Sequence, residues 1–121
     1  MRNYKDLIVW QKSHELTLKI YSATKSFPKE ELYGISSQMR RSSASIATNI
    51  AEGCGRGTDT EFKRFIIIAS GSASELDYQL VLCKDLGYLS PENFKELYEL
   101  ITSTRKMLYA LVNVLSSDSK G

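Results

Sequence analysis

Apolar residues recur every three or four positions along four long stretches of this chain, which is the spacing of an amphipathic α-helix. The stretches cover roughly residues 7–26, 32 or 35 to 52, 58–86 and 90–115. No stretch alternates apolar and polar residues as a half-buried strand does. The pattern therefore predicts an all-α protein.

The expected helix ends carry residues that stop or start a helix. The first helix stops before Phe27-Pro28, because a residue that precedes proline avoids helical geometry. The second runs into a turn with glycine at positions 53, 55 and 57, where a left-handed backbone costs little. Thr58 and Glu61 form a capping box for the third helix, and Ser90-Pro91 begins the fourth.

The apolar stripes of the four helices must cover one another, and short loops join consecutive helices. We therefore expect an up-down-up-down antiparallel four-helix bundle that forms a single domain over residues 1–121, with residues 116–121 as a flexible tail. The predicted stripes are Val9, Trp10, Leu16, Ile20 and Tyr21; Ile35, Met39, Ser42, Ile46, Ile50 and Gly53; Phe62, Phe65, Ile66, Ala69, Ala73, Leu76, Leu80, Cys83 and Leu86; and Phe94, Leu97, Ile101, Leu108, Val112 and Leu115.

The second helix is rich in small side chains, which allow a neighbouring backbone to approach closely. We expect tight helix packing there, either within one subunit or between subunits. The small residues are Ser36, Ser37, Ser42, Ser43, Ala44, Ser45, Ala47, Thr48 and Ala51.

Composition and charge are those of an ordinary globular protein. Hydrophobic residues make up 42% of the chain, and no apolar run reaches the roughly 18 residues of a membrane span. The N-terminus lacks the pattern of a signal peptide, so Cys54 and Cys83 are expected to be reduced thiols in a cytoplasmic protein. The net charge of +2 is well below that of a dedicated nucleic-acid binder.

The residues that catalysis or metal binding would need are scarce. His14 is the only histidine, so no nucleophile has an obvious base, and we predict no catalytic residues and no small-molecule substrate. One histidine and two distant cysteines lack the paired spacing of a zinc site. We therefore expect no metal and no other cofactor.

Polar residues on the second and third helices suggest a second kind of site. Ser45, Asn49 and Glu52 share one face of the second helix, and Ser72 and Glu75 are neighbours on the third. We interpret these five residues as a hydrogen-bonded layer that sets the register of the helices. Acid–base chemistry by the two glutamates is the alternative, although the Glu-x-x-His pairs of di-iron bundles are absent from the sequence.

Basic residues near the glycine turn suggest contact with phosphate. The turn precedes a helix N-terminus, but it lacks the preceding strand and the Gly-Lys-Ser/Thr ending of a nucleotide loop, so an interhelical turn is the simpler interpretation. A basic patch for nucleic acid is one hypothesis, and ordinary surface charge or intersubunit ion pairs is the other. The candidate residues are Arg40, Arg41, Arg56, Lys63 and Arg64.

Motifs along nearly the whole chain resemble those of the four-helix-bundle family that includes the 23S rRNA intervening-sequence proteins. They are Tyr4-Lys5-Asp6-Leu7-x-x-Trp10-Gln11-Lys12, Phe27-Pro28-Lys29-Glu30-Glu31-Leu32-Tyr33-Gly34, Gln38-Met39-Arg40-Arg41, Asn49-Ile50-Ala51-Glu52-Gly53-x-Gly55-Arg56, Phe62-x-x-Phe65, Ala69-x-Gly71-Ser72-x-x-Glu75-Leu76 and Leu86-Gly87-Tyr88-Leu89. The resemblance implies a helical bundle that associates as a homopentamer. It also implies a relation to the accessory variability determinants of diversity-generating retroelements, which bind nucleic acid and a reverse transcriptase.

Three functional hypotheses remain open at this stage. The first is a non-enzymatic, homo-oligomeric RNA-binding or ribonucleoprotein accessory protein, whose partner is RNA or a nucleic-acid-processing protein. The second is a protein-binding scaffold that uses exposed aromatic residues such as Tyr98 and Tyr109. The third and least favoured is an enzyme that uses Glu52 and Glu75.

Overall fold

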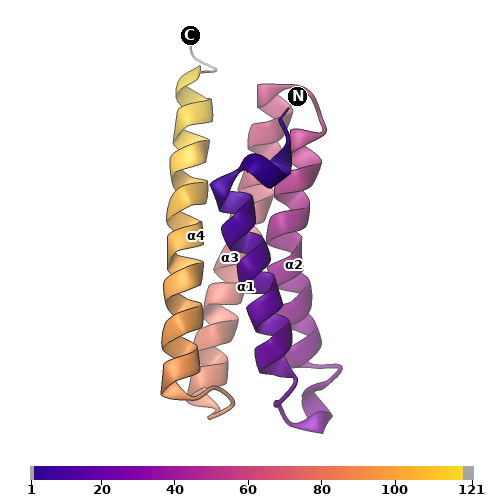
Figure 1. The fold of residues 1–121 in the computed structure, drawn as a ribbon, viewed down its shortest axis with the longest axis vertical. Helices are drawn as coiled ribbons and strands as arrows, with labels where there is room; N and C mark the ends of the chain where they lie inside the picture. Colours follow the sequence, from indigo (N-terminus) through magenta and orange to yellow (C-terminus); the bar gives the residue numbers. More distant parts are fainter. Residues whose placement is uncertain (1, 119–121) are drawn as a thin grey trace.

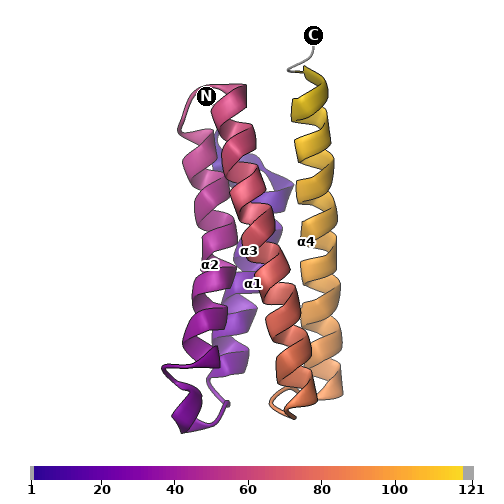
Figure 2. The ribbon, with the colours of Figure 1, turned by 180° about the vertical axis from the view of Figure 1, so that it is seen from behind.

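Four antiparallel helices form a bundle in the computed structural model, which describes residues 2–118 (Figure 1). They are α1 (Ile8–Thr24), α2 (Ile35–Cys54), α3 (Asp59–Asp85) and α4 (Pro91–Asp118). Two short 3-10 helices, η1 (Tyr4–Asp6) and η2 (Lys29–Glu31), precede α1 and α2. Each helix packs against its neighbours in the chain, and α4 closes the bundle against α1 (Figure 2). The predicted fold class is confirmed.

The predicted apolar stripes form one continuous core, with two exceptions. Tyr21 is 43% exposed, because it lies on the side of α1 where its ring meets the Arg40 side chain rather than the core. Leu86 is 51% exposed, because it follows the last turn of α3 as the C-cap residue. The fully or nearly buried core includes Leu16, Ile20, Met39, Ile46, Ile50, Phe62, Ile66, Leu76, Leu80, Ile101 and Leu108.

The helix boundaries follow the predicted signals closely. The Thr58 side chain accepts a hydrogen bond from the Glu61 backbone N–H, as the capping box predicts, and Ser90 caps α4 in the same way through Asn93. Gly57 has a φ of +87°, a conformation that favours glycine. Helix α4 runs to Asp118, three residues into the expected tail, and residues 119–121 of that tail lie outside the described part of the chain.

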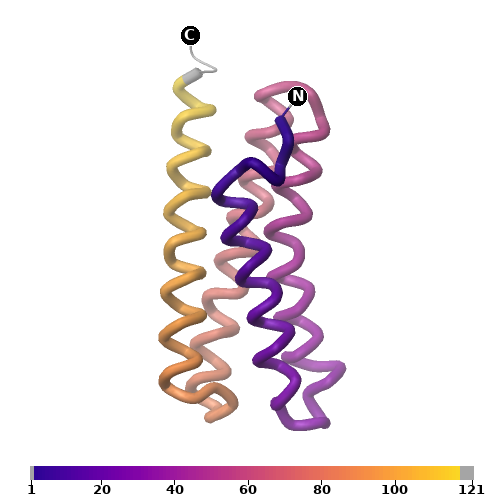
Figure 3. The backbone as a smooth tube through the Cα atoms, viewed as in Figure 1, coloured from indigo at the N-terminus to yellow at the C-terminus, as the bar shows by residue number. Residues whose placement is uncertain are grey.

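The two ends of the bundle differ in how the chain connects the helices (Figure 3). At one end, here called the Gly-turn end, residues 55–58 join α2 to α3, and the N-terminal segment packs beside them through Arg2 and Asp59. At the other, here called the Pro-loop end, residues 25–34 join α1 to α2. No helix in the part of the chain that the structure describes is long and apolar enough to cross a membrane.

Candidate functional site

Arg56 and Arg64 lie together at the Gly-turn end, and each is paired with a carboxylate. Arg56 Nη2 is 3.3 Å from Glu52 Oε1, one helical turn away. Arg64 donates to both carboxylate oxygens of Glu61, at 2.9 and 3.3 Å, and this hydrogen bonding lowers the pKa of Glu61. Both guanidinium groups lie over the Phe65 ring, at 4.9 and 4.5 Å from its centroid. These cations therefore already have partners within the chain.

Arg2 adds a third pair at the same end, which the sequence reasoning missed. Its guanidinium donates to Asp59 at 2.8 Å and lies 4.4 Å from the centroid of the Phe62 ring. Arg2 and Asp59 are 57 residues apart, so no local sequence pattern predicts the contact. Together with half-buried Lys63, these three pairs amount to four cations beside three carboxylates, which leaves little net charge among them.

Arg40 at the Pro-loop end is held in place without a carboxylate. Its Nε donates to the Thr24 hydroxyl at 2.9 Å, and its guanidinium carbon lies 5.1 Å from the centroid of the Tyr21 ring. Within residues 2–118 its two Nη atoms have no acceptor, so they remain available for an outside oxyanion. Arg41 is exposed on the side of α2 that faces α3, as expected for adjacent helical residues about 100° apart.

The loop that follows α1 adds more free charge and an exposed aromatic ring. Lys25 and Lys29 are exposed and form no ion pair among the described residues. Glu31 accepts a hydrogen bond from the Tyr88 hydroxyl at 2.9 Å, which ties this loop to the α3–α4 connection. Tyr33 is 94% exposed and therefore contributes almost nothing to the core.

The five basic residues predicted as one site do not form a single patch. Arg56, Lys63 and Arg64 lie at the Gly-turn end, whereas Arg40 and Arg41 lie at the Pro-loop end. At 1.5 Å per helical residue, Arg40 and Arg56 are about 24 Å apart along α2. The sequence placed all five near the glycine turn because it gives no direct measure of how far α2 carries Arg40 away from it.

Three of the five predicted polar-layer residues form a hydrogen-bonded group between α2 and α3. The hydroxyls of Ser45 and Ser72 are 2.9 Å apart and join the two helices. Asn49 Nδ2 donates to the Ser45 carbonyl at 2.8 Å and to its hydroxyl at 3.0 Å. These bonds join partly buried side chains of the two helices, and their role in setting the register of α2 against α3 stays a prediction.

The two glutamates of the predicted layer are separate. Glu52 is exposed and pairs with Arg56, whereas Glu75 accepts from Gln79 Nε2 at 3.3 Å. Gln79 in turn accepts a 2.6 Å hydrogen bond from buried Ser42 and forms a second α2–α3 bridge that the sequence reasoning did not identify. The available signal was the helical period, because Gln79 lies three residues after Leu76 and beside Leu80 on the apolar side of α3. The pairing of Glu52 with Glu75 that acid–base chemistry would need is absent from the described residues.

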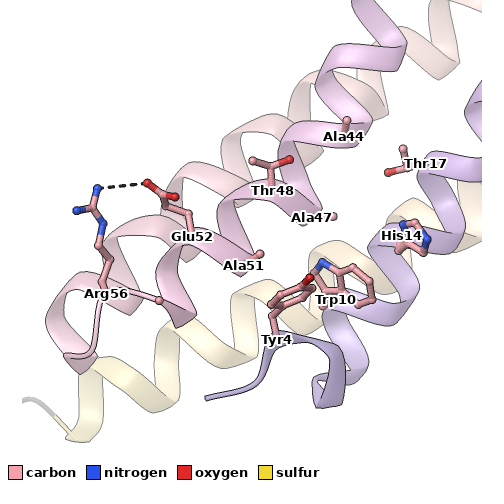
Figure 4. A pocket seen from close by; sticks show the side chains of 11 residues that line it. Tyr4, Trp10, His14, Thr17, Ala44, Ala47, Thr48, Ala51, Glu52 and Arg56 are labelled. Carbon is pink, nitrogen blue, oxygen red and sulfur yellow. Dashed lines mark hydrogen bonds and ion pairs between the residues drawn. The ribbon is translucent and has the colours of Figure 1, made fainter. Parts of the chain in front are cut away.

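A groove of about 700 Å³ runs between α1 and α2, and it holds side chains that sequence reasoning did not group (Figure 4). One wall is an aromatic stack, in which the Trp10 and His14 rings lie 5.0 Å apart and nearly parallel at 9°. Tyr4 meets Trp10 edge-on, with ring centroids 4.9 Å apart. Small residues form the opposite wall, and the Arg56–Glu52 ion pair lies at one end; the small lining residues of α2 are Ala44, Ala47, Thr48 and Ala51.

The cysteines are placed as structural residues. Both are buried, and Cys83 donates to the Met39 sulfur at 3.4 Å. Burial raises the pKa of Cys83 to about 11 and also raises the pKa of Cys54, so neither is a ready nucleophile. Among the described residues, no three His, Cys, Asp or Glu side chains gather as metal ligands, and the prediction of no metal stays a prediction.

Comparison with known proteins identifies the family. The family model described as "23S rRNA-intervening sequence protein" matches residues 5–110. A crystal structure from Bacteroides thetaiotaomicron, described as a protein with unknown function from the S23 ribosomal protein family, is similar, with a TM-score of 0.78 and 26% identity. The similarity covers 87% of this chain and 98% of that one. Comparison with curated proteins gives no match. The chain therefore belongs to the 23S rRNA-intervening sequence protein family.

Proposed function

We propose that this protein is a non-enzymatic, self-associating bundle that contacts RNA through its Pro-loop end and acts as a ribonucleoprotein accessory protein in the cytoplasm. The family description supports a link to rRNA genes. The scattered carboxylates and the single, exposed histidine offer no catalytic arrangement in the part of the chain that the structure describes.

The observation that carries the proposal is the free guanidinium of Arg40. A hydrogen bond from Nε and stacking on Tyr21 restrict the side chain, while both Nη groups face no carboxylate among residues 2–118. A restricted guanidinium loses little entropy when it binds a phosphate in a bidentate manner. Arg41, Lys25 and Lys29 add unpaired positive charge nearby.

Self-association strengthens this modest charge. We propose a homopentamer, as the family resemblance implies, in which five copies with a net charge of +2 each together carry about +10. Exposed apolar side chains on α3 and α4 support association, because large exposed apolar patches mark interfaces. These side chains are Ile67, Ile68, Tyr78, Tyr109 and Val114.

A salt titration of RNA binding tests the proposal. The Arg40→Gln/Arg41→Gln variant is expected to bind RNA more weakly and to show a shallower dependence on salt, because two phosphate contacts are lost. The matched control is Arg2→Gln/Arg64→Gln, which removes the same charge from the Gly-turn end at two arginines that lie outside the α1–α2 groove. Absence of RNA binding by the unaltered protein at low salt, or equal loss in both variants, would contradict the proposal.

A protein-binding scaffold is the second candidate, favoured by the exposed α3–α4 aromatic residues. Tyr109 is exposed in the second half of α4, and Tyr98 is half-buried and donates to Asp77 at 2.9 Å. In this case Arg40→Glu with Arg41→Glu should leave partner binding unchanged, and Tyr109→Ala should weaken it. Purification of the native protein with and without nuclease treatment distinguishes the two candidates.

A further inference from the structure

The facing sides of α1 and α2 carry complementary stripes, which line the groove and end just beyond it where the Arg40 guanidinium lies over the Tyr21 ring. On α1, Trp10, His14, Thr17 and Tyr21 recur at helical spacing, and three of the four are rings. On α2, residues 40, 44, 47 and 51 recur at the same spacing, as arginine followed by three alanines. Planar groups therefore line one wall, and the opposite wall has small side chains that leave space between the helices.

The aromatic wall can be extended by a further planar ring. His14 stacks on Trp10 almost in parallel and is itself exposed, so a ring can pack against the side that faces solvent. Tyr21 lies one turn beyond Thr17, outside the lining residues, and is partly exposed with Arg40 over its ring. Base–aromatic stacking tolerates any sequence, because every nucleobase has a π-face.

An arginine side chain lies near each end of this track, paired with a carboxylate at Arg56 and without one at Arg40. Arg56 lines one end of the groove, and Arg40 lies one helical turn beyond Ala44, just outside the lining residues at the other end. Their separation of about 24 Å matches on the order of seven nucleotides at 3.4 Å per stacked base. Glu52 is the only carboxylate among the residues that line the groove, and it is paired with Arg56.

We propose that the α1–α2 groove binds a single-stranded stretch of nucleic acid, with unpaired bases on the Trp10–His14 wall and phosphates at Arg40 and Arg56. The proposal rests on the proposed function and names the form of nucleic acid that it involves. A duplex has its bases stacked inside and offers their faces to no side chain. The helix of a second copy is disfavoured, because hydroxyls, an imidazole and an ion pair interrupt the apolar lining.

Trp10 makes the test direct, because it is the only tryptophan in the chain. A base that stacks in the groove should quench its fluorescence. The experiment titrates the full chain at low salt with an eight-nucleotide oligouridylate and, separately, with a blunt RNA duplex. We expect saturable quenching by the single strand and little quenching by the duplex.

The matched variants are Thr48→Glu and Ser74→Glu. Thr48 is exposed within the groove, whereas Ser74 is exposed on α3, so both substitutions add one negative charge without touching the core. Thr48→Glu should weaken oligouridylate binding on the order of tenfold, the loss expected for a displaced stacked base, and Ser74→Glu should not. Circular dichroism of both variants should show that they remain helical.

The other outcomes separate this inference from the proposed function. If the single strand binds without quenching and Thr48→Glu binds it normally, nucleic acid uses another surface and the groove proposal fails alone. If Thr48→Glu instead converts an oligomer into single protomers, a second copy fills the groove and the proposal is wrong. If no RNA of either form binds at low salt, both the groove proposal and the proposed function fail.

Discussion

The Gly-turn end and the Pro-loop end both carry several cations but use them differently. At the Gly-turn end, Arg2, Arg56 and Arg64 each pair with a carboxylate and lie over a phenylalanine ring that belongs to the core. At the Pro-loop end, Arg40 and Arg41 have no carboxylate partner among the described residues. The number of basic residues therefore does not measure the charge available to a partner.

The difference reflects two roles for the same residue type. An arginine that covers an aromatic ring shields apolar surface with its stem and is neutralised by its neighbour, so it contributes to folding. An arginine fixed by one hydroxyl, as Arg40 is by Thr24, keeps its remaining donors free for binding. We therefore expect substitutions of Arg2 and Arg64 to affect mainly stability and those of Arg40 and Arg41 to affect mainly binding.

Phe62→Ala should cause the largest loss of stability among these substitutions. Phe62 is 1% exposed beneath Arg2, and removal of its ring leaves a cavity that costs about 3–5 kcal/mol of unfolding free energy. Urea denaturation measures the loss. The matched substitution at the Pro-loop end is Tyr33→Ala, which should change stability by less than about 0.5 kcal/mol. Comparable losses in both variants would contradict the division of roles.

Gly53→Ala should destabilise the Gly-turn end through overpacking. A Cβ at Gly53 would lie 2.9 Å from Phe65 Cβ and 3.1 Å from Phe62 Cδ1, so the expected cost is about 1–3 kcal/mol. Gly71 in α3 is the control, because a Cβ there meets nothing within 4 Å. Gly71→Ala should stabilise the protein by about 0.5–1 kcal/mol, since alanine favours the helix. Thermal unfolding of both variants shows whether the two changes have opposite signs.

Alkaline pH should lower the free energy of unfolding through Cys83, which lies at the Pro-loop end. Burial, followed by the nearby Glu31 carboxylate, raises the pKa of this thiol from 9.0 to about 11. Between these values the folded protein keeps a proton that the unfolded chain releases, so stability falls as pH rises, by on the order of 1–2 kcal/mol. Unfolding curves from pH 8 to 11 measure the slope. Cys83→Ala should show a smaller slope, and an unchanged slope would remove Cys83 as the cause.

Glu52→Gln should give the smallest change in stability and the sharpest test of the comparison. Loss of the exposed Arg56–Glu52 pair costs less than about 0.5 kcal/mol. The released Arg56 should then strengthen RNA binding. The control is Glu99→Gln, which removes the same charge from an exposed position on α4. Equal gains in both variants would show that net charge alone, rather than the release of Arg56, sets the affinity.

Periodicity and caps were sufficient to predict the four α-helices of this protein. The spacing of Ile46, Ile50, Ile66 and Leu80 shows directly which side of each helix is buried, because helical geometry converts sequence distance into a face. The Thr58 cap and Gly57 turn are equally local. Tyr21 departs from its predicted place because Arg40, from another helix, provides its ring with a partner at the surface.

The amino-acid sequence by itself determined the four amphipathic helices, their antiparallel order and the family motifs, since these depend on contacts within a few residues or on simple burial of stripes. Only the tertiary structure decided which charges are paired and which are free. The Arg2–Asp59 pair, the Ser42–Gln79 bridge and the α1–α2 groove all join residues far apart in the chain. Such contacts depend on the register between packed helices, and that register is set by the core as a whole.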